Sequence, residues 1–96
     1  GMIVSNEPGY YKPGEYGIRI ENLVLVVEAP IESEGKYLGF ETLTFVPLDR
    51  TLVDKNLLTE AEIGWWNRYH EQVEAILGPQ MDGDDRAWLK DQCTPL

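Results

Sequence analysis

The chain has 96 residues and a net charge of -9 at pH 7, with 8 Lys and Arg against 17 Asp and Glu. Nucleic acids and anionic membranes recruit clustered Lys and Arg, so this balance excludes both as expected partners. No run of about 18 apolar residues is present, which excludes a transmembrane helix. The single cysteine, Cys93, cannot form an intrachain disulfide and is consistent with a reducing, cytoplasmic compartment.

The first predicted element is a β-hairpin with strands over residues 3–11 and 16–28. Both ranges are rich in β-branched and aromatic residues, and Pro13 and Gly14 between them are typical of a turn. A turn centred on Gly14 pairs residues whose numbers sum to 28. Glu7 and Glu21 would then face each other, with Cβ atoms roughly 5 Å apart, and Arg19 would lie on the same face.

Two opposed carboxylates repel each other unless they share a proton, a cation such as Arg19 lies between them, or a metal ion bridges them. The alternative is that Glu7 and Glu21 are simply solvated on the wet face of a hairpin. After Glu21 the strand is apolar on both faces, which is typical of a central strand. An unpartnered carboxylate is costly in such a strand, which favours a partnered site.

A third strand is predicted over residues 37–47, after a polar turn from Pro30 to Gly35, and Pro47 ends it. With the hairpin it would form an antiparallel sheet. Glu41 lies on this strand and is a conceivable third acidic site residue. Because single glutamates are routine on surface strands, we place it outside the site.

Two helices are predicted after the sheet, over residues 59–77 and 84–92. Thr59 and Glu62 form a capping box, and apolar residues then recur at steps of three and four until Gly78 and Pro79. Acidic residues near the start of the second helix suit its dipole. The predicted fold class is therefore α+β, an antiparallel sheet followed by two helices.

Several residues on these helices suggest chemistry that the pattern does not support. His70, the one histidine, lies on the apolar stripe without a ligand partner at the helical spacing, so packing or surface exposure is expected. Cys93 lacks a base beside it in sequence to act as a nucleophile. Residues 82–85 suggest a calcium loop only faintly, because the position of the bidentate glutamate falls on Cys93. Trp65, Trp66, Trp88 and Leu89 are expected to pack the helices against the sheet or a neighbouring subunit.

Two motifs of the hairpin resemble a known enzyme family. Glu-Pro-Gly-Tyr-Tyr at 7–11 and Gly-Ile-Arg-Ile-Glu-Asn at 17–22 resemble the last two metal-ligand motifs of the Xaa-Pro aminopeptidases, the aminopeptidase P branch of the pita-bread metallopeptidases. Residues 38–47 and 65–70 resemble the carboxyl-terminal extension of longer members. The resemblance implies a terminal fragment of a pita-bread fold, with closing strands of the catalytic domain at 1–48 and a helical extension at 49–96.

The resemblance also implies a metal site. In that family two divalent metal ions, usually Mn²⁺, are held by two aspartates, one histidine and two glutamates, and the glutamates match Glu7 and Glu21. Glu7 would also handle a proton during catalysis, while Tyr11 and Arg19 would orient the metal ligands. The family's other ligands precede the first motif, so the chain is expected to be a carboxyl-terminal fragment, inactive alone, with no metal or partial occupancy.

The implied parent removes the amino-terminal residue from peptides with proline in second position. This chain would join the rest of the catalytic domain, and the longer relatives suggest a homodimer. The alternatives are a non-catalytic assembly or dimerisation module, and a fragment of a prolidase-like or creatinase-like relative, since those share the glutamate pair.

Overall fold

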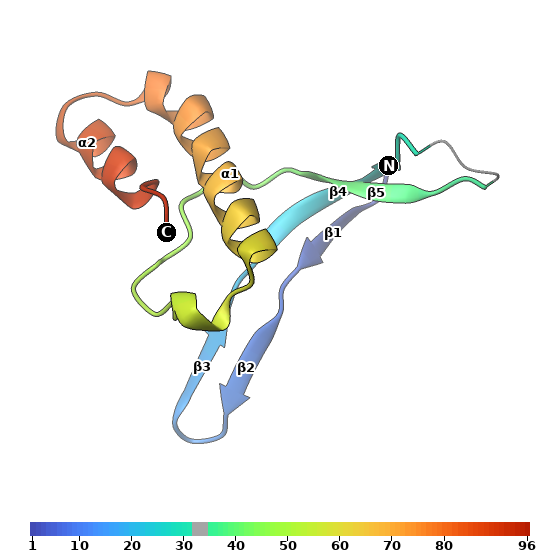
Figure 1. Cartoon of the computed structure of the whole chain (residues 1–96), viewed down its shortest axis with the longest axis horizontal. Helices are drawn as coiled ribbons and strands as arrows, with labels where there is room; N and C mark the ends of the chain where they lie inside the picture. Colours follow the sequence, from blue (N-terminus) through green and yellow to red (C-terminus); the bar gives the residue numbers. More distant parts are fainter. Residues whose placement is uncertain (32–34) are drawn as a thin grey trace. The chain divides into compact units, whose positions relative to one another are not determined.

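The structure is a computed structural model that describes residues 1–31 and 35–96. These residues form two compact units, 1–44 and 45–96 (Figure 1). The division expected from the resemblance, after residue 48, lies a few residues later along the chain. Part of the turn predicted from Pro30 to Gly35, residues 32–34, lies outside the described residues. In the part of the chain that the structure describes, no helix is long and apolar enough to cross a membrane.

Unit 1 contains a three-stranded antiparallel sheet in the order β1 (Ile3–Asn6), β4 (Asn22–Glu28) and β5 (Leu38–Thr42). β4 is the central strand, as its two apolar faces predicted. β1 pairs with β4 from Ile3 opposite Leu25 to Asn6 opposite Asn22, so paired residue numbers sum to 28. β5 pairs with the other edge of β4.

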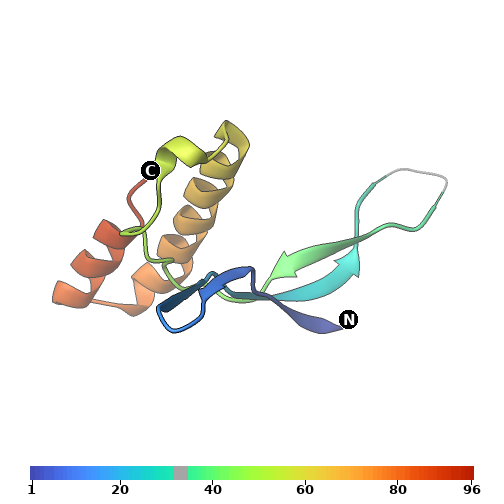
Figure 2. The ribbon, with the colours of Figure 1, turned by 90° about the horizontal axis from the view of Figure 1, so that it is seen from below.

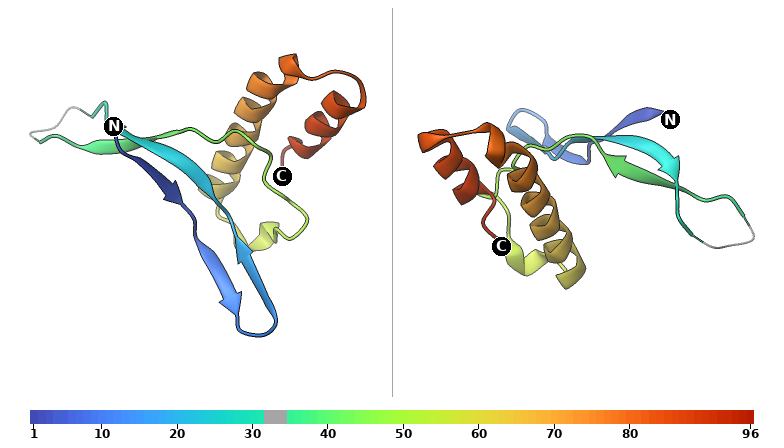
Figure 3. Two further views of the ribbon diagram at one scale, coloured as in Figure 1. Left: turned by 180° about the vertical axis from the view of Figure 1, so that it is seen from behind. Right: turned by 90° about the horizontal axis from the view of Figure 1, so that it is seen from above.

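The same hairpin continues as a two-stranded ladder of β2 (Gly9–Lys12) and β3 (Tyr16–Arg19). Gly9 lies opposite Arg19 and Lys12 opposite Tyr16, again with numbers that sum to 28. Gly14 forms the turn with a φ of 74°, a left-handed conformation that glycine adopts readily. Figure 3 shows β1 and β2 along one arm of the hairpin and β3 and β4 along the other. The predicted register is confirmed.

The strands are shorter than predicted. Each arm of the hairpin is interrupted, at Glu7 and Pro8 on one side and at Ile20 and Glu21 on the other. The N–H of Ile20 donates to the carbonyl of Pro8 (3.1 Å), but proline has no N–H to donate in return, so the ladder breaks there.

The third predicted strand, 37–47, ends at Thr42. The N–H of Leu43 still donates to the carbonyl of Leu23 (2.9 Å). The N–H of Leu23 is taken by the side-chain hydroxyl of Thr44 (2.8 Å), so a side chain replaces the backbone partner and the ladder stops. Further along, within unit 2, the backbone of Val46 bonds to the hydroxyl group of Tyr69.

Unit 2 contains two α-helices, α1 (Glu60–Leu77) and α2 (Gly83–Gln92), with short 3-10 helices η1 (Lys55–Leu57) and η2 (Gly78–Gln80) before and after α1. Figure 2 shows α1 and α2 side by side. Both predicted helices are confirmed. The capping box is complete: Glu62 N–H donates to Thr59 Oγ1 (3.2 Å) and Thr59 N–H donates to Glu62 Oε2 (2.8 Å).

The core of unit 2 lies between its two helices. Its buried members are Tyr69, Val73, Leu89 and Cys93, and partly buried Phe45, Leu48, Leu77 and Met81 pack against them. Trp66 is also buried, but Trp65 is 47% and Trp88 55% exposed. Within the chain Leu89 packs inward and Trp88 stays exposed. The expectation that Trp88 packs against a neighbouring subunit stays a prediction.

Candidate functional site

The register places Glu7 across from Glu21, and Arg19 connects them. Arg19 Nε lies 3.0 Å from Glu21 Oε2, and Arg19 Nη1 lies 3.9 Å from Glu7 Oε2. The three side chains are between 41% and 50% exposed. One guanidinium thus offsets the repulsion between two carboxylates, which is one of the three arrangements that the sequence allowed.

Two further side chains hold this group in place. Ser5 Oγ donates a hydrogen bond to Glu7 Oε1 (2.9 Å). Hydrogen bonding by the Tyr11 side chain raises the pKa of Arg19 above its ordinary value, and the charge of Glu21 acts in the same direction. Arg19 therefore lies beside Glu7 and Glu21, and Tyr11 lies beside Arg19, as the resemblance implied. Ser5 was missed, although its position two residues before Glu7 on a strand could have indicated it.

The donor chemistry of the pair suits a hard divalent cation, because Glu7 and Glu21 offer carboxylate oxygens. Within residues 1–31 and 35–96, no three His, Cys, Asp or Glu side chains come together as a metal site would require. The pair therefore fits part of a metal-ligand set.

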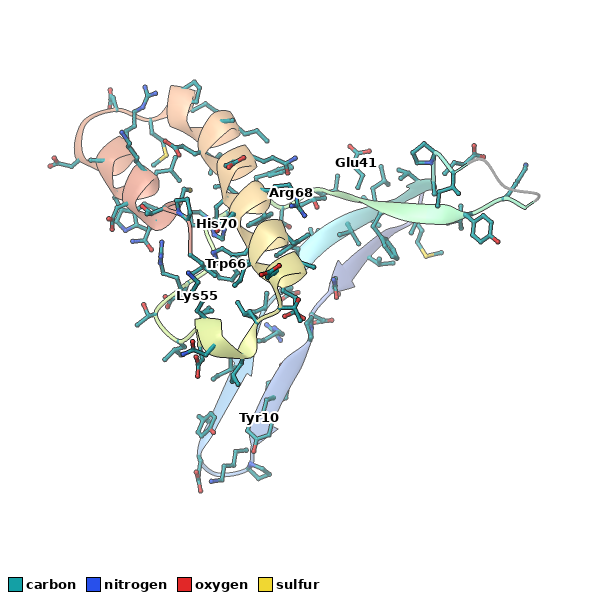
Figure 4. All side chains as sticks on the ribbon, in the orientation of Figure 1. Tyr10, Glu41, Lys55, Trp66, Arg68 and His70 are labelled. Atoms are coloured by element: carbon teal, nitrogen blue, oxygen red, sulfur yellow. The ribbon has the colours of Figure 1, made fainter. Side chains whose placement is uncertain are left out.

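Glu41 does not join the pair. It lies opposite Leu25 on β4, four positions beyond Glu21 (Figure 4). At about 3.4 Å per residue, that offset along the strand is roughly 14 Å. The interpretation of Glu41 as a strand residue outside the site is consistent with this placement.

His70 is a buried packing residue, as expected. Leu48 N–H donates to His70 Nε2 (3.1 Å), and His70 Nδ1 lies 2.8 Å from the carbonyl oxygen of Trp66 (Figure 4). Because Nε2 accepts a hydrogen bond, Nδ1 carries the proton and donates to that carbonyl. Both ring nitrogens are occupied, so His70 has none to offer to a metal ion.

Cys93 is buried, and burial raises the pKa of its thiol, with the charge of Glu74 acting in the same direction. A thiol with a raised pKa is a poor nucleophile at neutral pH, because the thiolate is the reactive form. The interpretation that Cys93 is not a nucleophile agrees with this.

Comparisons with known sequences identify the protein family to which the chain belongs. Residues 36–96 match the family model described as the C-terminal region of peptidase M24, and residues 1–28 match metallopeptidase family M24. The chain belongs to this family of metallopeptidases. It is 48% identical to a probable Xaa-Pro aminopeptidase P of Coprinopsis cinerea and 43% identical to Xaa-Pro aminopeptidase 2 of Homo sapiens, each over the whole chain. The chain spans only 16% and 15% of the length of these two relatives.

A solved structure gives the same result. The X-prolyl aminopeptidase from Caenorhabditis elegans, described as a cytosolic enzyme with a di-nuclear active site, matches 98% of this chain with a TM-score of 0.83 at 39% identity. The match covers 16% of that enzyme. The predicted α+β fold and the resemblance to Xaa-Pro aminopeptidases are confirmed. The roles of Glu7, Glu21, Tyr11 and Arg19 remain predictions.

Proposed function

We propose that this chain contributes two metal ligands, Glu7 and Glu21, to a dinuclear metallo-aminopeptidase. The enzyme removes the amino-terminal residue from peptides with proline in second position. The observation that carries the proposal is the opposition of Glu7 and Glu21 around Arg19. Similarity to Xaa-Pro aminopeptidases over the whole chain supports the substrate class. The remaining ligands belong to a longer protein, since the relatives are much longer than this chain.

Each residue has a separate task in this proposal. Glu7 and Glu21 hold the metal ions through their carboxylate oxygens, and Glu7 also accepts a proton during attack. Arg19 and Ser5 fix the direction of those oxygens, and Tyr11 fixes Arg19. When bound, the two ions activate water for attack and polarise the scissile carbonyl. We assign manganese because the resemblance to the family implies it, and carboxylate ligands suit hard cations of that kind.

The surroundings of the site support a larger assembly. Unit 1 exposes large apolar side chains on its strands, including Tyr10, Leu23, Leu38 and Phe40. We assign residues 1–48 to the closing strands of the catalytic domain, the rest of which covers these side chains, and residues 49–96 to an extension that supports a homodimer. A free thiol at Cys93 and the cytosolic C. elegans enzyme support a cytoplasmic location.

The test is an assay of the longer protein, loaded with Mn²⁺, on a peptide with proline in second position. Glu7→Gln and Glu21→Gln should each lower kcat/KM by about 100-fold and reduce the bound metal. Glu41→Gln removes the same charge from β5 of the same unit and is the matched control, which should keep full activity. The 96-residue chain alone should give no turnover. Full metal content and activity in Glu21→Gln would overturn the proposal.

A further inference from the structure

Two glycines of the hairpin have no room for a side chain. A Cβ atom at Gly17 would lie 2.7 Å from Tyr11 Cδ1, and a Cβ atom at Gly9 would lie 2.8 Å from the Tyr11 hydroxyl oxygen. Both distances are shorter than heavy atoms tolerate without a shift. The Tyr11 ring therefore lies directly over Gly9 and Gly17. The glycines with positive φ are Gly14 and Gly83, so the φ angles of Gly9 and Gly17 would accept alanine. At Gly17 only the ring opposes a Cβ atom, whereas at Gly9 the backbone carbonyl oxygen of Ile18 also lies close, at 3.0 Å.

The strand register shows where the hydroxyl group of Tyr11 lies. Tyr11 lies directly opposite Gly17, and Gly9 lies directly opposite Arg19. The ring starts at position 11 and runs back along its own strand, so its hydroxyl reaches the level of the Gly9 and Arg19 pair. Arg19 extends from that level to Glu21 and Glu7. A ring that stood away from the sheet would place the hydroxyl elsewhere.

We propose that Gly9 and Gly17 are positioning residues of the candidate metal site. Their missing side chains let Tyr11 lie flat on the hairpin, and Tyr11 in this pose holds Arg19 against Glu7 and Glu21. The link to metal binding rests on the proposed function, but the pose itself can be tested without metal. The competing explanation is that the ring only covers two glycines, a known way of stabilising sheets. If the ring only covered the glycines, moving it would not change the hydrogen exchange of Arg19.

The first measurement locates the ring in the metal-free 96-residue chain by NMR. An aromatic ring above a glycine shifts the Hα resonances upfield, so those of Gly9 and Gly17 should lie upfield of ordinary glycines. Tyr11→Leu should return both to ordinary positions. Tyr10→Leu is the matched control, because Tyr10 is the neighbouring residue and points to the opposite face. Ordinary Hα shifts for both glycines in the unaltered chain would overturn the proposal.

The second measurement asks whether the ring position controls Arg19. In Gly17→Ala, the Nε–H of Arg19 should exchange with solvent several-fold faster than in the unaltered chain. Gly39→Ala is the control, because a Cβ atom there would meet Ala29 Cβ at an ordinary 3.6 Å. Tyr11→Leu should have the same effect as Gly17→Ala, and the double variant should add nothing. Unchanged Arg19 exchange in Gly17→Ala and Tyr11→Leu would leave only the covering role and contradict the proposal.

The two proposals can fail separately. If Glu21→Gln keeps full metal content and activity in the longer protein while the ring and Arg19 behave as described in the 96-residue chain, the proposed function fails and the positioning role is retained. If Mn²⁺ acts at the glutamates but Arg19 exchange ignores Gly17→Ala, the positioning role fails alone. If the Gly17→Ala chain does not fold, Tyr11→Leu tests the same contact and decides the question.

Discussion

Glu7 and Glu21 lie across from each other in a hairpin, and their carboxylates contact the same guanidinium, that of Arg19. The regular ladder is interrupted at this level because Pro8 cannot donate a backbone hydrogen bond. The two carboxylates and one guanidinium together retain a negative charge. A divalent cation would therefore meet two oriented carboxylates rather than a neutral surface.

The Arg19 ion pairs should contribute little to folding. All three side chains are about half exposed, where solvent and salt screen an ion pair strongly. We expect Arg19→Gln to leave the midpoint of urea denaturation close to that of the unaltered chain. Lys12→Gln is the control, because it breaks the Lys12 and Glu15 pair of similar exposure. A clearly lower midpoint for Arg19→Gln than for Lys12→Gln would show that the group serves the fold.

The register of this site could be predicted because it depends on local information. The turn at Pro13 and Gly14 sets which residues face each other, and alternation then sets the face of Glu7, Arg19 and Glu21. The same alternation places Ser5 on the face of Glu7, but the hydrogen bond from Ser5 to Glu7 and the flat pose of Tyr11 could not be predicted in this way. Both depend on side-chain rotamers and on the space above neighbouring residues, which a period-2 pattern does not contain.

Tyr69→Phe should destabilise unit 2 through one hydroxyl group. Tyr69 is buried, and its hydroxyl accepts from Val46 N–H (3.2 Å) and donates to the Val46 carbonyl (2.7 Å). Val46 is 56% exposed, so water can replace the lost partner, and the loss should be that of an ordinary hydrogen bond, about 0.5–1.5 kcal/mol. Urea denaturation followed by circular dichroism measures the change. Tyr37→Phe, at an exposed tyrosine, should cost almost nothing, and an equal effect of both variants would contradict the expectation.

The helices were predictable for the same reason as the register. The capping box of Thr59 and Glu62 and the stop at Gly78 are local signals. The bonds from Tyr69 to Val46 and from Leu48 to His70 join residues 23 and 22 positions apart. Periodicity marked Tyr69 and His70 as packing positions, but it carries no information on which distant backbone groups they satisfy.

Cys93 should be unreactive in the folded chain. Burial and Glu74 raise its pKa, so less thiolate is present at a given pH than for an ordinary thiol. We expect slow modification by a disulfide reagent in buffer and fast modification in urea. The folded state keeps the thiol proton to higher pH than the unfolded state, so stability should fall as pH rises above the ordinary thiol value of about 8.5. Equal modification rates in buffer and urea would contradict this expectation.

The isolated chain should self-associate through the edge strand β5. Phe40 on this strand is 71% exposed, and an apolar edge strand with unpaired backbone groups is prone to pairing. Light scattering should give an apparent mass that rises with concentration, and Phe40→Lys should lower it. Leu57→Lys, which makes the same charge change at an 81% exposed residue in η1, is the control. A strictly monomeric chain at high concentration would contradict the prediction.

The most direct test of the metal-ligand assignment is a Mn²⁺ titration of the 96-residue chain followed by NMR. The unpaired electrons of Mn²⁺ broaden nearby resonances even when binding is weak, as expected for two carboxylates where about six ligands are needed. We predict that the amides around Glu7 and Glu21 broaden first, that Glu21→Gln abolishes this effect, and that Glu41→Gln leaves it intact. Broadening centred on Asp84 and Asp85 instead, or unchanged by Glu21→Gln, would contradict the assignment.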